Sequence, residues 1–286
     1  MKSIAHYHRI IFVVSATITL GPLAEAAPIT FNTALPLSEG EGVVRQQIIY
    51  SHASDDQLGV RREVDTFKSV SVAGYGVTSK LAVFGVLPIV KRDLEIGPVS
   101  SSMSGLGDAT LFARYQIYQK DGPGRTLRLA PFAGVILPTG ETGRTGDGST
   151  DVFGGLVLTA ASTDWNFDTQ IKYVANGKAN GLQRGNTISL DGSLQYRLHP
   201  GKIDAQTSGF LFGVIEASLS HAENDQRAGI DDANSGGDLL ILSPGLQYAT
   251  RRWIAEAAIR VPVSTNLNGT ALAPDYSVLA SLRVNF

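Results

Sequence analysis

The chain has 286 residues, of which 43% are hydrophobic, and its formal net charge is -2. This balance excludes the strongly basic surface of nucleic-acid-binding proteins, so no nucleic-acid partner is expected. The absence of cysteine excludes disulfides and thiolate chemistry, while 31 glycines and 12 prolines indicate many strands and turns.

The N-terminus has the pattern of a secretory signal. Lys2 and Arg9 precede the apolar run IIFVVSATITL (residues 10–20), and the small-residue sequence AEA follows at residues 24–26. A positive region, an apolar core and an A-x-A site predict a signal peptide over residues 1–26 that is removed on export. The apolar core is too short to span a bilayer, so it predicts no transmembrane helix.

After cleavage near Ala26, residues 27–42 are expected to form a short periplasmic N-terminal lead. The remaining chain, residues 43–286, repeatedly alternates apolar and polar residues, and this period of two indicates strands with one apolar face. The clearest examples are residues 165–175, 186–198 and 275–286, each about ten residues long, which is enough for a tilted strand to cross a bilayer. Twelve strands are predicted, beginning near Val43, Val64, Ser79, Gly107, Thr126, Thr150, Trp165, Asn186, Gly209, Asp238, Trp253 and Asp275.

The connections between these strands alternate in length. Short turns are expected at 75–78, 162–164 and 251–252, and long polar linkers at 89–106, 138–149, 222–237 and 264–274. An even strand number with short turns at one end and long loops at the other is typical of outer-membrane barrels. The predicted fold is therefore all-β: a transmembrane antiparallel up-and-down β-barrel of about twelve strands in the outer membrane of a Gram-negative bacterium, with lipid as its outer partner.

The tight turn at 251–252 also predicts a register. It places apolar residues opposite apolar residues on the lipid face and polar opposite polar on the luminal face, as a correct register requires. The expected pairs are Leu246 with Ala257, Leu242 with Val261, Gln247 with Glu256 and Ser243 with Arg260.

Three stretches, GLGDATLFARYQIY (105–118), PFAGVILPTGE (131–141) and GSTDVFGGLVLT (148–159), with the lead-in NTALPLSEGEG (32–42), resemble the bacterial outer-membrane family named for the meta-pathway of phenol degradation. The resemblance covers most of the exported chain. It implies a barrel that takes up aromatic or other apolar compounds. The family provides no catalytic or binding residues to transfer. Because only about sixteen residues precede the first strand, a lumen filled by a long N-terminal plug is not expected.

Residues that could carry chemistry are few. His52, His199 and His221 fall at different strand ends, and no nucleophile, phosphate-loop or zinc motif is present, so no catalytic residue and no cofactor are expected. The loop GIDDANSGGD (229–238) resembles the start of a calcium loop but lacks the later bidentate Glu, so a solvated external loop is favoured and no metal is expected.

Charged residues at predicted inward positions form the strongest candidate site. Either they pair across strands and hold the wall together, or unpaired ones set the selectivity of a pore. Twelve strands would enclose at most roughly 12 Å of free lumen, enough for a small-molecule solute. The candidate pore-lining residues are Arg114, Arg128, Asp168, Lys172, Asp191, Arg197, Glu216, Glu256, Arg260 and Arg283.

Two further features concern the wall itself. Pro244, Gly245 and Pro262 interrupt neighbouring strands, which indicates either an ordinary bulge or a lateral seam for apolar molecules. The terminal Phe286 continues the apolar face to the last residue, so we expect it to act as a signal for the outer-membrane assembly machinery. The function expected is an outer-membrane channel for small molecules, with a barrel that lacks a transport role, enzymatic or structural, as the alternative.

Overall fold

The computed structural model describes residues 26–57, 59–204 and 207–286. Apart from Ala26, the expected signal peptide lies outside these residues. None of the described residues belongs to a helix long and apolar enough to cross a membrane.

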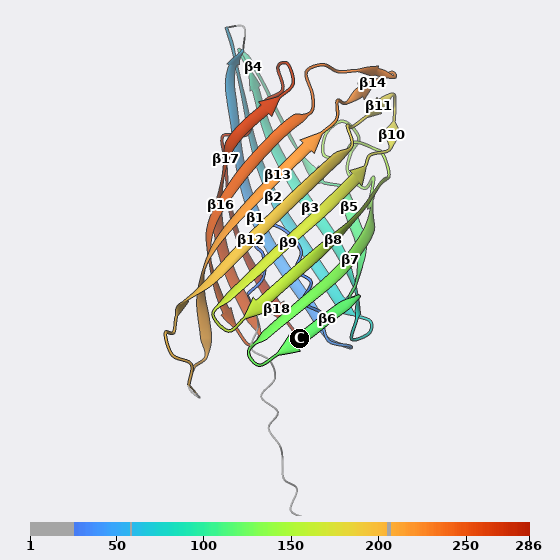
Figure 1. Cartoon of the computed structure of the whole chain (residues 1–286). Helices are drawn as coiled ribbons and strands as arrows, with labels where there is room; N and C mark the ends of the chain where they lie inside the picture. The colour runs from blue at the N-terminus through green and yellow to red at the C-terminus, as the bar shows by residue number, and fades with distance from the viewer. Residues whose placement is uncertain (1–25, 58, 205–206) are drawn as a thin grey trace, which may run out of the picture.

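Twelve long antiparallel strands form a closed barrel (Figure 1). Each pairs with its neighbours in chain order, and β1 pairs with β18 to close the ring. This confirms the predicted fold class. The wall strands are β1 (Gly42–Gln57), β2 (Val60–Gly76), β3 (Leu81–Ile96), β5 (Ala109–Tyr115), β7 (Arg125–Leu137), β8 (Asp151–Ser162), β9 (Trp165–Ala175), β12 (Thr187–His199), β13 (Gly209–Ala222), β16 (Gly237–Thr250), β17 (Trp253–Leu267) and β18 (Tyr276–Asn285).

Six short strands lie at the two ends of the barrel. β4 (Val99–Leu106) pairs with the outer half of β3, and β6 (Tyr118–Gly122) pairs with β7 at the short-turn end. In the long loops, a small sheet contains β10 (Lys178–Ala179), β11 (Leu182–Gln183), β14 (Gln226–Arg227) and β15 (Ile230–Asp231).

The expectation of a linker over 89–106 was wrong. Residues 89–96 continue β3, and β4 returns beside them as a hairpin. Outward positions of this part of β3 include Lys91, Asp93 and Glu95, whose charges suit water rather than lipid. The strand therefore continues beyond the apolar band of the barrel, where its sequence no longer alternates between an apolar and a polar face.

Alternate side chains of the wall strands face opposite sides. On β9, Phe167 and Ile171 are exposed on the outer face, while Asp168 and Gln170 are buried inside. Three of the four expected pairs across the 251–252 turn are present, namely Leu246 with Ala257, Leu242 with Val261 and Gln247 with Glu256. The lumen is consequently polar in large part, and the apolar side chains outside provide the surface that lipid covers.

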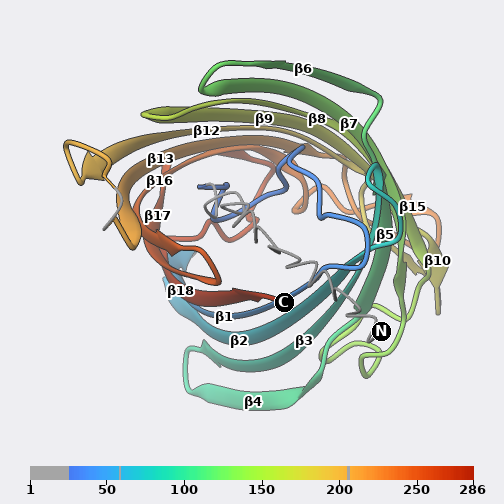
Figure 2. The same ribbon diagram turned by 90° about the horizontal axis from the view of Figure 1, so that it is seen from below.

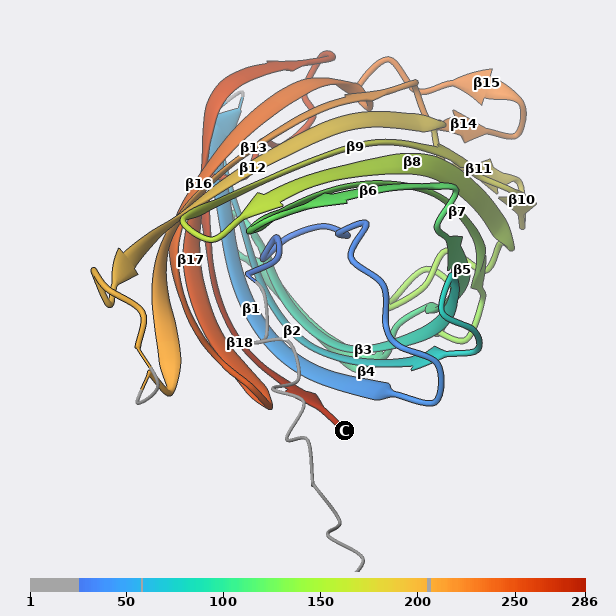
Figure 3. The same cartoon turned by 60° about the horizontal axis from the view of Figure 1, so that its bottom comes forward.

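The N-terminal lead differs from its expected periplasmic position. Residues 26–35 lie inside the barrel, where Ala26, Ile29 and Ala34 are almost fully buried, and Figures 2 and 3 show this part of the chain crossing the interior of the ring. Residues 26–38 are uncharged and belong to no strand, so their backbone N–H and C=O groups need partners outside a sheet. The inward carboxylates, amides and guanidinium groups of the wall supply such partners. We call residues 26–35 the luminal segment.

Candidate functional site

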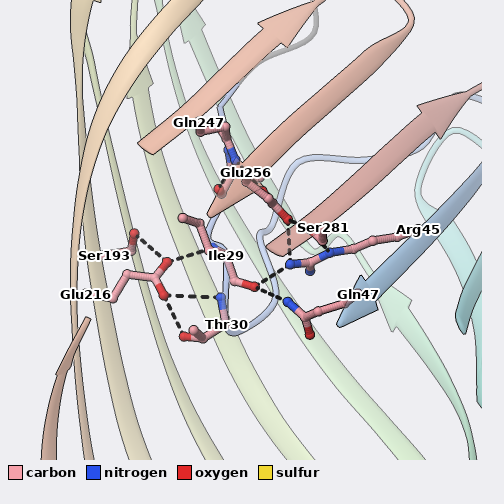
Figure 4. Close-up of polar contacts among 10 residues, drawn as sticks. Ile29, Thr30, Arg45, Gln47, Ser193, Glu216, Gln247, Glu256 and Ser281 are labelled. Atoms are coloured by element: carbon pink, nitrogen blue, oxygen red, sulfur yellow. Dashed lines mark hydrogen bonds and ion pairs between the residues drawn. The ribbon is translucent and has the colours of Figure 1, made fainter. Parts of the chain in front are cut away.

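The carboxylate of Glu216 is the first anchor of the luminal segment. It projects inward from the middle of β13 and accepts hydrogen bonds from the backbone N of Ile29 at 2.7 Å and from the backbone N of Thr30 at 3.1 Å. The hydroxyl of Thr30 donates a third bond at 2.6 Å, and Ser193 on β12 donates a fourth at 3.1 Å (Figure 4). Several backbone and hydroxyl donors thus satisfy a buried charge that would otherwise be costly.

A second anchor lies in the adjoining part of the wall, on β1, β16 and β17. The guanidinium of Arg45 donates to the carbonyl of Ile29 and forms an ion pair with Glu256 at 2.5 Å (Figure 4). Gln247 makes a two-way contact with Ala27, accepting from its N at 3.2 Å and donating to its O at 3.0 Å. Gln247 also donates to Glu256 at 2.6 Å, so these side chains form one network around the segment.

The third anchor holds the far end of the luminal segment. The hydroxyl of Thr159 on β8 accepts a bond from the N of Ala34 at 2.8 Å. The guanidinium of Arg114 on β5 donates to the carbonyl of Leu35 at 2.6 Å and lies 5.1 Å from the ring centroid of Phe84. The segment is therefore tied to both sides of the barrel and fills its short-turn half.

Apolar packing also holds the luminal segment in place. Ile29 is fully buried in a cluster that includes Phe212 and Leu279, and Ala34 packs in a second cluster with Phe132. A Cβ added at Gly245 would lie 2.8 Å from the Cδ1 atom of Ile29, so the absence of a side chain there makes room for the segment. This is the physical role of Gly245, one of the three residues of the expected lateral seam.

The lumen has two chemically different walls. Strands β3, β5, β7 and β8 provide a row of aromatic rings: Phe84 stacks on Phe112 at 4.7 Å, and Phe153 lies 6.1 Å from Phe112 and 6.4 Å from Phe132. Strands β9 and β12 instead present buried amides, hydroxyls and carboxylates, including Gln170, Gln195 and Asp191. An apolar ring therefore has a favourable surface opposite a polar part of the lumen.

The predicted pore-lining charges occupy different places. Arg114, Glu216 and Glu256 hold the luminal segment as described, and Arg283 lies inward on β18 opposite Arg45. The carboxylate of Asp168 accepts hydrogen bonds from Thr159 and Gln195. The carboxylate of Asp191 accepts from Gln170 at 2.9 Å and from Ser218 at 2.5 Å.

The other four predicted charged residues make no hydrogen bond to the luminal segment. Arg128 bonds to Gln116 and lies 3.5 Å from Asp121 near the short-turn end. Arg197 contacts Asp164 and turn carbonyls at the rim rather than the middle of the lumen. The side chains of Lys172 and Arg260 take part in no hydrogen bond or ion pair within the described residues.

Pro244 and Pro262 occupy irregular parts of the wall. The pairing of β16 with β17 passes from Leu242 directly to Gly245, whereas the pairing of Pro244 with β13 is kept. Beside Pro262, the register shifts by one residue between Leu240 and Ile241. Both prolines therefore lie where backbone pairing is locally interrupted or displaced.

The long-loop mouth carries its own contacts. Arg62 donates to Asp55 at 2.8 Å and to the carbonyl of Thr270 at 2.9 Å, tying the last long loop to the first hairpin. The Arg62 guanidinium holds the pKa of Asp55 below its usual range. The histidines stay separate: His52 contacts Asp65 and His221 contacts Asp238.

Several functional residues were missed by sequence reasoning. Arg45, Thr159 and Gln247 contact the luminal segment, and Lys68 and Arg92 project into the lumen from β2 and β3. The alternation of inward and outward positions along β1, β2 and β3 was the signal that could have identified Arg45, Lys68 and Arg92 as luminal residues. The uncharged stretch before Glu39 was the available signal for the segment itself.

A closed antiparallel barrel with an apolar exterior and a polar interior defines an outer-membrane β-barrel protein. The chain belongs to the family described as "Putative MetA-pathway of phenol degradation", whose model matches residues 39–267. This confirms the resemblance noted in the sequence.

Comparison with solved structures gives the following similarities, of which the first shows the same fold. An outer membrane channel from Pseudomonas putida F1 has a TM-score of 0.68 and 14% identity, with 92% of this chain and 100% of that chain covered. The β domain of the Bordetella autotransporter BrkA has a TM-score of 0.48 and 14% identity, covering 87% and 100% of the two chains. A Pseudomonas aeruginosa FadL homologue has a TM-score of 0.43 and 10% identity, covering 88% and 76%. No curated protein matches the chain by sequence.

Proposed function

We propose that the protein is a channel in the outer membrane that passes small aromatic or other apolar molecules, and that it performs no catalysis. The observation that carries this proposal is the row of four phenylalanine rings inside the barrel, because these rings provide a stacking surface for a small aromatic molecule within the lumen. The luminal segment gates this path. The proposal includes removal of the signal peptide, residues 1–26, by cleavage near Ala26 on export, after which the luminal segment begins at Ala27.

The direct test measures permeation through the purified protein in liposomes, with benzyl alcohol as the probe and with empty liposomes as the reference. Protein-dependent uptake that falls when Phe112 is replaced (Phe112→Ser) supports the proposal. If uptake never exceeds that of empty liposomes, even after the luminal segment is deleted, the proposal is wrong and the alternative of a non-transporting barrel is favoured.

The C-terminal residue should matter for assembly. The backbone of Phe286 exchanges hydrogen bonds of 2.7 and 3.0 Å with Gly42, and its side chain is 73% exposed on the outer surface. We propose that the assembly machinery binds this strand. Deleting Phe286 should reduce the heat-modifiable barrel in outer membranes roughly tenfold, because closure and recognition are both lost. Phe286→Tyr serves as the control, and normal levels of the deletion variant would disprove the role.

A lateral route for apolar molecules would use the interrupted pairing at Pro244. Pro244→Val restores a backbone donor to β16, and we expect it to lower benzyl alcohol uptake severalfold without changing ion conductance. Pro131→Val, on the distant strand β7, is the matched control. Equal uptake by a well-folded Pro244→Val protein would leave only the axial route.

A further inference from the structure

Three cationic side chains gather in the lumen on the long-loop side of the luminal segment. Arg260 on β17 and Arg92 on β3 belong to one row of paired inward residues, and Lys68 on β2 belongs to the next row. The charges of both arginines act on the Lys68 ammonium. The row runs from Arg260 through Ser277, Ser51 and Thr66 to Arg92. We call these five residues and Lys68 the cationic row.

These cations form no ion pair with any residue that the structure describes. Within residues 26–57, 59–204 and 207–286, no hydrogen bond or ion pair engages the side chains of Lys68, Arg92 or Arg260. The Nε atom of Arg260 is buried without a partner. Like charges held together in a poorly solvated place repel one another, so an anion bound among them would be stabilised.

The nearby luminal carboxylates do not bond to the row. Glu216 and Asp191 are the acidic groups whose charges act on Arg260. Glu216, however, is occupied by Ile29, Thr30 and Ser193, and Asp191 by Gln170, Ser189 and Ser218. Both carboxylates use their oxygen atoms to accept bonds from other groups, so they attract Arg260 without bonding to it and leave the N–H donors of its guanidinium open to a ligand.

The surroundings of the row indicate what kind of anion fits. The hydroxyls of Ser277 and Ser51 lie 2.8 Å apart between the two arginines and add hydrogen-bonding capacity. Apart from Lys68, the inward residues on both sides are apolar. Toward the luminal segment the row is bordered by Leu279, Ile49 and Val90, and toward the long loops by Ala53, Val64 and Leu94.

A narrow cationic band between two apolar bands suits a molecule with one negative group and an apolar body. Guanidinium groups present paired N–H donors that match a carboxylate. We propose that the cationic row is a solute-binding site for ionised apolar monocarboxylic acids, which bind there on the long-loop side of the luminal segment. This inference rests on the proposed channel function and names a substrate class for it.

The test compares two probes of similar shape, benzoate and neutral benzyl alcohol, for binding to the purified full-length barrel by saturation-transfer NMR. Benzoate should bind better than benzyl alcohol. Arg260→Gln and Lys68→Gln should each weaken benzoate binding about tenfold or more, because each removes a charged hydrogen-bond donor. Lys91→Gln is the matched control, since Lys91 adjoins Arg92 on β3 but its side chain is 57% exposed and bonds to Asp93.

Heat-modifiable mobility checks the folding of each variant, and Arg92→Gln replaces any variant that fails to fold. Equal binding of the two probes, or unchanged benzoate affinity in the folded row variants, would overturn the inference. The liposome assay separates the two claims: if benzyl alcohol still permeates while benzoate shows no preference for the row, the channel function stands and the carboxylate site does not.

Discussion

Deleting residues 28–35 should convert a nearly closed barrel into an open pore, with ion conductance in planar bilayers rising roughly tenfold. The reason is that Glu216, Arg45 and Arg114 tie these residues to several strands, so they occupy the short-turn half of the lumen. Twelve strands without them would leave a lumen of up to roughly 12 Å.

The control for this deletion is the double substitution Glu39→Gln and Glu41→Gln. Both side chains are exposed just before β1, so their charges are removed without disturbing the contacts inside the lumen. Conductance of this variant should remain low. If the deletion variant folds but conducts no more than the wild type, the luminal segment is not the element that closes the pore.

Replacing Glu216 with Ala should release the luminal segment without removing it. The segment loses three hydrogen bonds to a charged group, each contributing about 1.5–3 kcal/mol. Even a net loss of about 3 kcal/mol shifts the bound-to-released ratio by roughly a hundredfold. We expect frequent openings in single-channel recordings and faster cleavage of residues 26–41 by a protease added from the short-turn side.

Asp191→Ala is the matched control for Glu216→Ala. Asp191 is also a luminal carboxylate, but its partners are the wall residues Gln170, Ser189 and Ser218 rather than the segment. Its removal should leave the protease resistance of the segment unchanged. Equal release by both variants would indicate a general loosening of the lumen instead of a specific anchor at Glu216.

The wall of the barrel was largely predictable because it separates two solvents. Lipid selects apolar side chains outside, and the lumen selects polar ones inside, so a period of two appears in strands such as 165–175. The close pairing of Gln247 with Glu256 followed from the same rule. The hairpin of β4 could not be found this way, since beyond the bilayer both of its faces meet water.

The content of the lumen was less predictable. An extended segment that is buried on every side, like residues 26–35, has no periodicity to reveal it. Lys68 and Arg92 were missed because the inward positions near them on β2 and β3 are mostly apolar, as at Val70 and Val90. Whether a luminal charge has a partner depends on contacts between distant strands, which a single sequence does not specify.

The pairing of β1 with β18 has a consequence for how the molecule folds. Val43 pairs with Asn285, so this ladder joins almost the two ends of the chain and has the highest contact order in the fold. Closing the ring therefore brings together strands from opposite ends of the sequence. Residues 36–41 form a short tether between the luminal segment and β1, so the segment stays near the short-turn end of the barrel when the ring closes. Such a tether would let the segment leave the lumen and return while the closing ladder stays intact.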